Sequence, residues 1–249
     1  MIFRQLFDKE TSTYTYLVAD DATGDAALVD PVLEHVERDL ELVRELGCRL
    51  VSVFDTHVHA DHVTGAGALR ERTKAITHVS VEGGAPCADV EMTHGHVARV
   101  GGVEITALAT PGHTSGCVSF VVAAEGERLR VLTGDALLVR GCGRTDFQEG
   151  DAATLWRSVH ERLFVLPDDT LVYPAHDYRG FTVSTVGEEK RLNPRLGARM
   201  DLESFVTLMK RLDLPPPGKI HEAVPANRAC GQRDGAAPSA PEPGLRERS

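Results

Sequence analysis

The chain has 249 residues, enough for one large domain or for one domain with an appendage. Its hydrophobic content of 42% and charged content of 26% are those of an ordinary globular protein. No basic run offsets the formal net charge of -10, which argues against nucleic acid and anionic membranes as partners, and no apolar stretch approaches the ~20 residues of a membrane helix.

The pattern of polar and apolar residues predicts strands with helices between some of them. In the first half we expect strands at residues 2–7, 13–19, 26–31, 50–55 and 76–81, and helices at 32–46 and 62–73. In the second half we expect strands at 103–108, 118–123, 129–133 and 171–174, and helices at 151–165, 186–192 and 202–212. This order indicates a layered α/β fold in which residues 2–110 and 115–175 each supply one sheet.

Processing signals and cysteines indicate the compartment. Residues 1–5 carry no signal-peptide pattern, so we expect a cytoplasmic protein or one that already lacks a targeting segment. The five cysteines are Cys48, Cys87, Cys117, Cys142 and Cys230. Their odd number and the absence of C-x-x-C spacing disfavour a disulfide framework and a thiolate zinc site, and fit a reducing compartment. Cys117 lies in a strand pattern and is expected to be a buried small hydrophobe.

The segment Thr56-His57-Val58-His59-Ala60-Asp61-His62 places three histidines and an aspartate within seven residues. It lies on the turn between a predicted strand and a predicted helix, where side chains can point at one spot in a crevice. Imidazole nitrogens and carboxylate oxygens are ligands of transition metals. Because such crowded groups would repel or desolvate each other without a cation, the segment predicts a metal site.

Three further strand patterns end at residues of the same kind, namely His113, Asp135 and His176. Two imidazoles and one carboxylate with open positions suit non-heme Fe(II) and oxygen chemistry. Three imidazoles and a water suit hydrolytic zinc. The types of ligand alone permit both. Other histidines, such as His78, are expected at the surface or hydrogen bonded in the core.

The motif T-H-x-H-A-D-H, followed in order by Pro-Gly-His113-Thr, Thr-Gly-Asp135 and Pro-Ala-His176, resembles the metallo-β-lactamase superfamily. The resemblance runs from about residue 10 to 230 and implies a four-layered αβ/βα sandwich with its metal site at the sheet edges. Two groups of the superfamily compete. Glyoxalase II is a binuclear hydrolase of S-lactoylglutathione, and the persulfide dioxygenases are mononuclear iron enzymes that oxidise glutathione persulfide to sulfite and glutathione.

Details favour the persulfide dioxygenases. Thr145-Asp146-Phe147-Gln148, the segment from Pro174 to Thr185, and Leu192-Asn193-Pro194-Arg195-Leu196 all resemble that group. Glyoxalase II typically has His-Glu-Tyr-Thr where this chain has His176-Asp177-Tyr178-Arg179, and a longer helical C-terminal domain.

The resemblance also implies roles for individual residues. The matching iron ligands are His57, His113 and Asp135, which would hold one Fe(II) per chain. The superfamily's other ligand positions are His59, Asp61, His62 and His176, and we assign these residues to hydrogen bonding around the iron ligands. The alternative that His176 binds a second metal is open. No catalytic residue beyond the iron ligands is required.

Binding of glutathione requires a cation and hydrogen-bond donors for its carboxylates. Tyr178 matches a tyrosine that contacts glutathione in both groups. Arg144 and, more weakly, Arg195 are candidates for a carboxylate, and a structural ion pair is the alternative for each. The expected partners are glutathione persulfide and O2, with a homodimer expected by analogy. The alternatives in function are hydrolysis of S-lactoylglutathione and a non-enzymatic role in persulfide sensing or metal storage.

For the domains, we expect a core with the metal site at residues 1–180 and a short helical part packed on it at 181–230. Residues 231–249, with several prolines and charges, are expected to form a disordered tail.

Overall fold

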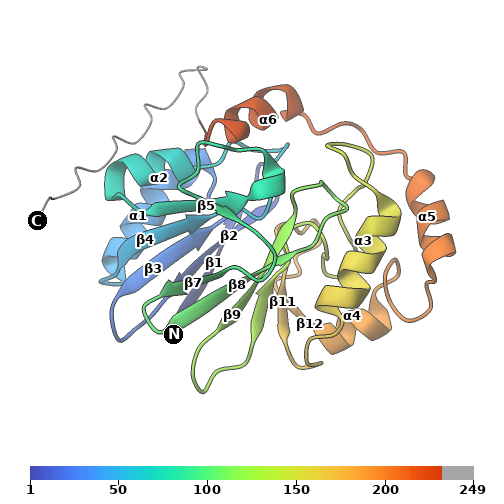
Figure 1. The fold of residues 1–249 in the computed structure, drawn as a ribbon, viewed down its shortest axis with the longest axis horizontal. Helices are drawn as coiled ribbons and strands as arrows, with labels where there is room; N and C mark the ends of the chain where they lie inside the picture. The colour runs from blue at the N-terminus through green and yellow to red at the C-terminus, as the bar shows by residue number, and fades with distance from the viewer. Residues whose placement is uncertain (232–249) are drawn as a thin grey trace, which may run out of the picture.

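The computed structural model describes residues 1–231, which form two six-stranded sheets (Figure 1). The first sheet has the order β1-β2-β3-β4-β5-β6, with strands β1 (Ile2–Asp8), β2 (Thr13–Ala19), β3 (Asp25–Val29), β4 (Arg49–Phe54), β5 (Ile76–Ser80) and β6 (Val90–Met92). The second has the order β12-β11-β10-β9-β8-β7, with β7 (Val97–Val100), β8 (Val103–Ala109), β9 (Val118–Ala123), β10 (Arg130–Leu132), β11 (Leu171–Tyr173) and β12 (Ser184–Thr185).

Helices cover the outer face of each sheet (Figure 1). On the first sheet lie α1 (Val36–Glu45), preceded by the 3-10 turn η1 (Leu33–His35), and α2 (Ala66–Thr73), while the 3-10 turn η2 (Val81–Gly83) follows β5. On the second lie α3 (Ala152–Ser158), continued by the π-helical turn η3 (Val159–Leu163), α4 (Val186–Leu192) and α5 (Leu202–Lys210). The last helix is α6 (Ile220–Arg228). Side-chain caps at Asp151, Thr185 and Asp201 begin α3, α4 and α5.

Three apolar clusters separate the four layers. Residues of both sheets, such as Tyr16, Phe54 and Phe120, meet between the sheets. Leu28 and Leu69 belong to the cluster between the first sheet and α1 and α2, and a third cluster joins the second sheet to α3, α4 and α5. Alternation on β8 shows the cause, because every second residue from Val103 to Ala107 is buried. The expected αβ/βα sandwich is confirmed.

The structure corrects the expected boundary between the sheets. It falls between β6 and β7, not near residue 110, because β7 and β8 form a hairpin within the second sheet. The short elements β6, β7, β12 and α6 were not predicted. The helix expected at 62–73 begins only at Ala66, since Val32 and Thr64 form a bridge that holds the preceding residues in a loop.

The expectation that the cysteines would stay unpaired was wrong for two of them. Cys87 and Cys230 form a disulfide, while Cys48, Cys117 and Cys142 are free. Sequence spacing misses such a pair because it joins segments 143 residues apart. The expectation for Cys117 is confirmed, since this thiol is buried.

The helices after residue 181 lie against the core. Val186 of α4 and Phe205 of α5 belong to the same apolar cluster as Val131 and Val172 of the second sheet. The proposed division at residues 180 and 230 stays a prediction, and the expected tail lies outside the described residues except for Gly231. None of the helices within residues 1–231 has the length and apolarity that crossing a membrane requires.

Candidate metal centre

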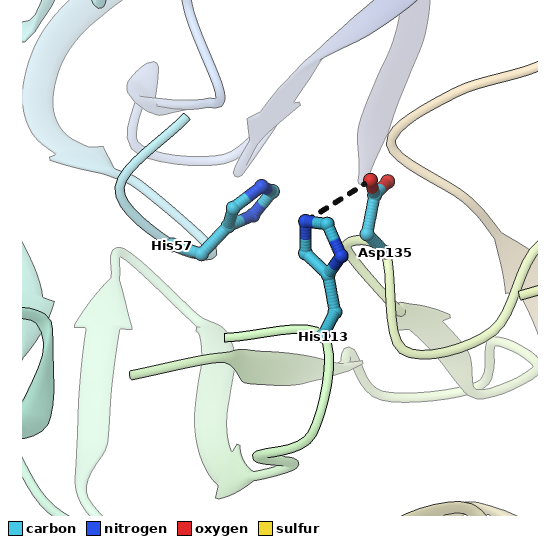
Figure 2. Close-up of side chains that lie close together, drawn as sticks. All are labelled: His57, His113 and Asp135. Atoms are coloured by element: carbon cyan, nitrogen blue, oxygen red, sulfur yellow. Dashed lines mark ion pairs between the residues drawn. The ribbon is translucent and has the colours of Figure 1, made fainter. Parts of the chain in front are cut away.

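Three segments that are distant in the sequence bring His57, His113 and Asp135 together (Figure 2). His57 follows β4 of the first sheet, whereas His113 and Asp135 follow β8 and β10 of the second. One ligand atom of each residue lies within 4.8 Å of the others, and His113 Nε2 is 3.5 Å from Asp135 Oδ2. The sites predicted at separate strand ends therefore form one cluster at the adjoining edges of the two sheets.

Hydrogen bonds leave the Nε2 atoms of both histidines free. The Nδ1–H of His113 donates to the carbonyl oxygen of Arg144 at 2.7 Å. Thr56 Oγ1 uses its only hydrogen on Asp30 Oδ2, so His57 Nδ1, at 3.0 Å, must donate to this oxygen. Each ring then carries the lone pair on Nε2, as a metal ligand requires.

The charge states also suit metal binding. Burial lowers the pKa of His57 well below its ordinary value, so the ring is neutral near pH 7. Burial by itself would raise the pKa of Asp135, but the charge of His176 and its hydrogen bond hold that pKa below the usual range. The neutral ring of His57, the free Nε2 of His113 and the carboxylate of Asp135 therefore face one point, which fits a single divalent transition metal with open positions.

His176 lies between two carboxylates. Its Nδ1 is 2.6 Å from Asp135 Oδ1, and its Nε2 is 3.0 Å from Asp61 Oδ2. Burial opposes a positive charge on this ring, but Asp135 and Asp61 raise its pKa well above the ordinary value. Thr13, which was not singled out in the sequence, donates to Asp61 Oδ2 at 3.0 Å.

A second group of donors consists of His59, Asp61 and His62, whose ligand atoms also lie within 4.8 Å of one another. His62 Nδ1 lies 3.0 Å from Asp61 Oδ2. Within the described part of the chain, His59 Nδ1 and His62 Nε2 are buried and have no hydrogen-bond partner. These three residues are therefore a second group that could hold a cation.

Asp30 is a supporting residue that the sequence reasoning missed. It is 1% exposed, has a positive φ of 51°, and follows β3. Its carboxylate accepts hydrogen bonds from Thr56 N, Thr56 Oγ1 and His59 Nε2. The sequence could have indicated Asp30, because this aspartate also stands at the end of a strand pattern, directly before Pro31.

A cavity of about 710 Å³ opens over the cluster. Its lining includes His57, His113, Asp135, Asp61 and His176, all of the predicted substrate residues, and the cations Arg140 and Arg179. Tyr178 is 73% exposed, and its ring is parallel to that of His176. An anionic ligand in this cavity thus has both a metal-type site and positive charges within reach.

The two predicted arginines differ in their contacts. Arg144 pairs with Asp146 through two hydrogen bonds of 2.7 Å, and donates to the carbonyl oxygens of Leu214 and Pro215. It therefore makes the structural ion pair that was its alternative role. Arg195 donates to the carbonyl oxygen of Cys142 at 3.2 Å and is the less engaged of the two.

The fold and this cluster define a member of the metallo-beta-lactamase superfamily, whose sequence pattern matches residues 8–176. The persulfide dioxygenase ETHE1, mitochondrial, of Homo sapiens is 49% identical over 231 residues, which are 93% of this chain and 89% of that protein. The crystal structure of ETHE1 from Myxococcus xanthus is 58% identical with a TM-score of 0.89, covering 93% of this chain and 100% of that one. The chain belongs to the persulfide dioxygenase family.

A more distant relative represents the competing group. The cytoplasmic hydroxyacylglutathione hydrolase of Arabidopsis thaliana is 33% identical over 222 residues, which are 86% of this chain and 82% of that protein. The identity of 49% to the persulfide dioxygenase and of 33% to the hydrolase agrees with the preference for the persulfide dioxygenases that the Thr145–Gln148 segment indicated.

Proposed function

We propose that the chain is a persulfide dioxygenase that uses one Fe(II) to oxidise glutathione persulfide with O2 and water to sulfite and glutathione. The observation that carries the proposal is the convergence of His57, His113 and Asp135 beneath a large cavity in a chain 49% identical to a persulfide dioxygenase. Iron supplies, when bound, the redox chemistry by which O2 reacts with the outer sulfur.

The protein's own groups would hold and orient the reactants. The two rings and the carboxylate would hold the metal, and because all three side chains line the cavity, a bound metal would be accessible to the substrate. His176 binds Asp135 Oδ1 and leaves Oδ2 turned toward His113. Leu138, Val139 and Leu214 contribute an apolar wall to the cavity.

Glutathione is the proposed carrier of the persulfide because the cavity is lined by cations. Arg195 and the newly found Arg140 and Arg179 lie beside Tyr178 in its lining. Arg140 is committed to Glu188 and Glu189, so Arg195 is our preferred partner for a glutathione carboxylate. A carboxylate role for Arg144 stays a prediction. A homodimer and a cytoplasmic location also stay predictions, and the mammalian relatives carry the word mitochondrial in their names.

Hydrolysis of S-lactoylglutathione is the second candidate, and one observation favours it. The free nitrogens of His59 and His62 next to Asp61 could bind a second cation, as a binuclear hydrolase requires. The lower identity to the Arabidopsis hydrolase argues against it.

Metal content and oxygen uptake distinguish the candidates. Protein loaded anaerobically with Fe(II) is expected to retain about one iron per chain and to consume O2 with glutathione persulfide. Asp135→Ala should lose both the iron and the oxygen uptake. About two metals per chain, with hydrolysis of S-lactoylglutathione and no oxygen uptake, would replace the proposal by the second candidate. Tight binding of iron with neither reaction would favour a metal-storage or sensing role.

A further inference from the structure

The disulfide between Cys87 and Cys230 fastens α6 to the rest of the molecule. Cys87 lies in the loop after η2 and is partly exposed, whereas Cys230 lies just after α6 and is 6% exposed. In Figure 1, α6 lies above the first sheet, on the side of α2. The proposed reaction makes no use of these two sulfurs.

Asn227 connects α6 to the loop that carries the ligands. Its side chain is buried, and Nδ2 donates to the carbonyl oxygens of His59 at 2.9 Å and His62 at 2.8 Å. Its Oδ1 accepts the backbone N–H of Thr64 at 2.8 Å. Together with Asp55 and His57, Asn227 also lines a small cavity behind the ligand loop. The position of α6 therefore bears directly on the backbone of residues 57–64.

The backbone at Cys230 and Gly231 packs tightly against the backbone of residues 64–67. The N–H of Gly67 donates to the carbonyl oxygen of Cys230 at 3.1 Å, and a Cβ on Gly67 would lie 2.3 Å from that oxygen. A Cβ on Gly231 would lie 2.2 Å from the carbonyl oxygen of Thr64. This close fit needs the end of α6 to be held in place.

The apolar contacts of α6 are small. Its buried Ala223 and Ala226 pack with Val63 and the partly buried Leu33. Alanine side chains bury little apolar surface, and Pro225 removes a hydrogen bond from the helix. The disulfide therefore adds a covalent attachment to these few apolar contacts and to the hydrogen bonds of Asn227.

We propose that Cys87–Cys230 is a thiol-exchange site that controls how firmly α6 supports the ligand loop. A low-molecular-weight thiolate attacks Sγ of Cys87, the more exposed cysteine of the pair, and forms a new S–S bond with it. The Cys87–Cys230 bond breaks, its electron pair leaves on Cys230, and this thiolate takes a proton from water. Attack of the Cys230 thiolate on the mixed disulfide reverses the step and releases the thiol. No other oxidant or reductant is needed.

The surroundings of Cys87 suit an anionic thiol. The guanidinium of Arg70 donates to the carbonyl oxygen of Cys87 at 2.7 Å and lies 3.3 Å from Asp89, which shares its charge. A guanidinium at the backbone of Cys87, whose charge is only partly balanced by Asp89, favours the approach of a thiolate. Glutathione is the thiol product of the proposed reaction, and only this choice of reagent rests on the proposed function. Accumulation of glutathione would then loosen the ligand loop, residues 57–64.

The test uses the full-length, Fe(II)-loaded protein without oxygen. Glutathione is expected to form an adduct on Cys87 in peptide mass mapping and to increase hydrogen exchange of the backbone amides of residues 57–67. It should also speed the transfer of iron to a chromogenic chelator about tenfold. The same changes are expected with 2-mercaptoethanol. Because hydrogen exchange requires neither iron nor turnover, failure of the proposed function would leave this readout intact.

Variants separate the disulfide from general thiol effects. Cys87→Ser should show fast iron transfer and fast exchange at residues 57–67 before any thiol is added. Cys48→Ser changes a partly exposed free cysteine and should behave as the unaltered protein. Iron transfer and amide exchange of Cys87→Ser within about twofold of the unaltered protein would overturn the proposal. If Cys87→Ser does not fold, opening of the disulfide in the unaltered protein without faster exchange at residues 57–67 overturns it equally.

Discussion

Each ligand histidine carries a hydrogen bond on the ring nitrogen that faces away from the metal-type site. For His57 the partner is Thr56 Oγ1, and for His113 it is the carbonyl oxygen of Arg144. These bonds fix which nitrogen is free, so the chemistry of the site depends on neighbours that bind no metal themselves. Asp30 acts on His57 through Thr56, because it accepts the hydroxyl hydrogen of Thr56 and so leaves Thr56 Oγ1 to accept from His57 Nδ1.

Thr56→Val tests this choice of tautomer. The variant keeps the shape of the side chain but removes the oxygen that accepts His57 Nδ1–H, so we expect Fe(II) affinity to fall about tenfold in a chelator competition. Thr56→Ser retains the hydroxyl and should restore most of the affinity. Equal affinity in the valine variant would show that Thr56 does not orient the ring.

Gly143→Ala tests the space beside two ligands. A Cβ at Gly143 would lie 2.6 Å from the carbonyl oxygen of Asp135 and 2.9 Å from His113 Nδ1. We expect the added methyl group to displace both ligands and to lower kcat/KM about 10- to 100-fold. Gly141→Ala is the control, since its Cβ would meet only Leu138 Cβ at 3.8 Å. Similar activity of the two variants would contradict the steric argument.

At the scale of elements, the parallel strands β4 and β5 place a histidine in the core. His78 pairs with Phe54 across the strands and stacks on its ring at 4.3 Å. It was expected at the surface or hydrogen bonded, but it is 6% exposed, and among residues 1–231 neither ring nitrogen has a partner. Burial, followed by the influence of His96, lowers the pKa of His78 to about 4.

The lowered pKa of His78 predicts that the free energy of unfolding decreases in acid. The unfolded chain has a histidine pKa near 6.5 and binds a proton that the folded state rejects, so stability is lost as the pH falls from about 6.5 toward 4. In His78→Phe we expect the free energy of unfolding, relative to the unaltered protein, to rise by about 2 kcal/mol between pH 7 and pH 5. Denaturant unfolding of both proteins at pH 7 and at pH 5 measures this change in free energy. His221→Gln, which changes an exposed histidine, is the control. If the difference in free energy of unfolding between His78→Phe and the unaltered protein did not depend on pH, His78 would not cause the loss of stability in acid.

At the scale of the whole molecule, α4 is joined to the cavity wall by an ion pair whose carboxylate is buried. Glu189 of α4 is fully buried and accepts hydrogen bonds from Arg140 N, the Arg140 guanidinium, Ser184 Oγ and Asn193 Nδ2. Arg140 has a positive φ of 58° and lines the cavity. The helical part after residue 181 therefore shapes the surface on which the substrate would lie.

Glu189→Ala is expected to lower the free energy of unfolding by about 1–3 kcal/mol, because it leaves the backbone N–H of Arg140 and the side chains of Ser184 and Asn193 without their buried acceptor. It should also raise KM for the persulfide more than it lowers kcat, since the metal ligands are not touched. Glu188→Ala is a matched control on the same helix. Glu188 also pairs with Arg140 but is 42% exposed, so its loss should cost about 0–1 kcal/mol. Equal effects of the two variants would disprove a special role for burial.

The local sequence determined much of this protein. Runs of β-branched and apolar residues gave most strands and helices, because alternation and helical spacing are properties of neighbouring residues. The metal-type side chains could be found for the same reason, since each stands at the end of such a run. The resemblance carried by the motifs around His57, His113, Asp135 and His176 agrees with the family that the comparisons show.

Only the tertiary structure decided which groups meet. The support of Asp30 and Asn227 for the ligand loop, the disulfide of Cys87 with Cys230, and the pairing of Arg140 with Glu189 all join residues distant in the chain. No periodicity marks such contacts, because they arise when the two sheets and their helices pack into one body. Burial in that packing also set the charge of His57 and of His78, which no local pattern contains.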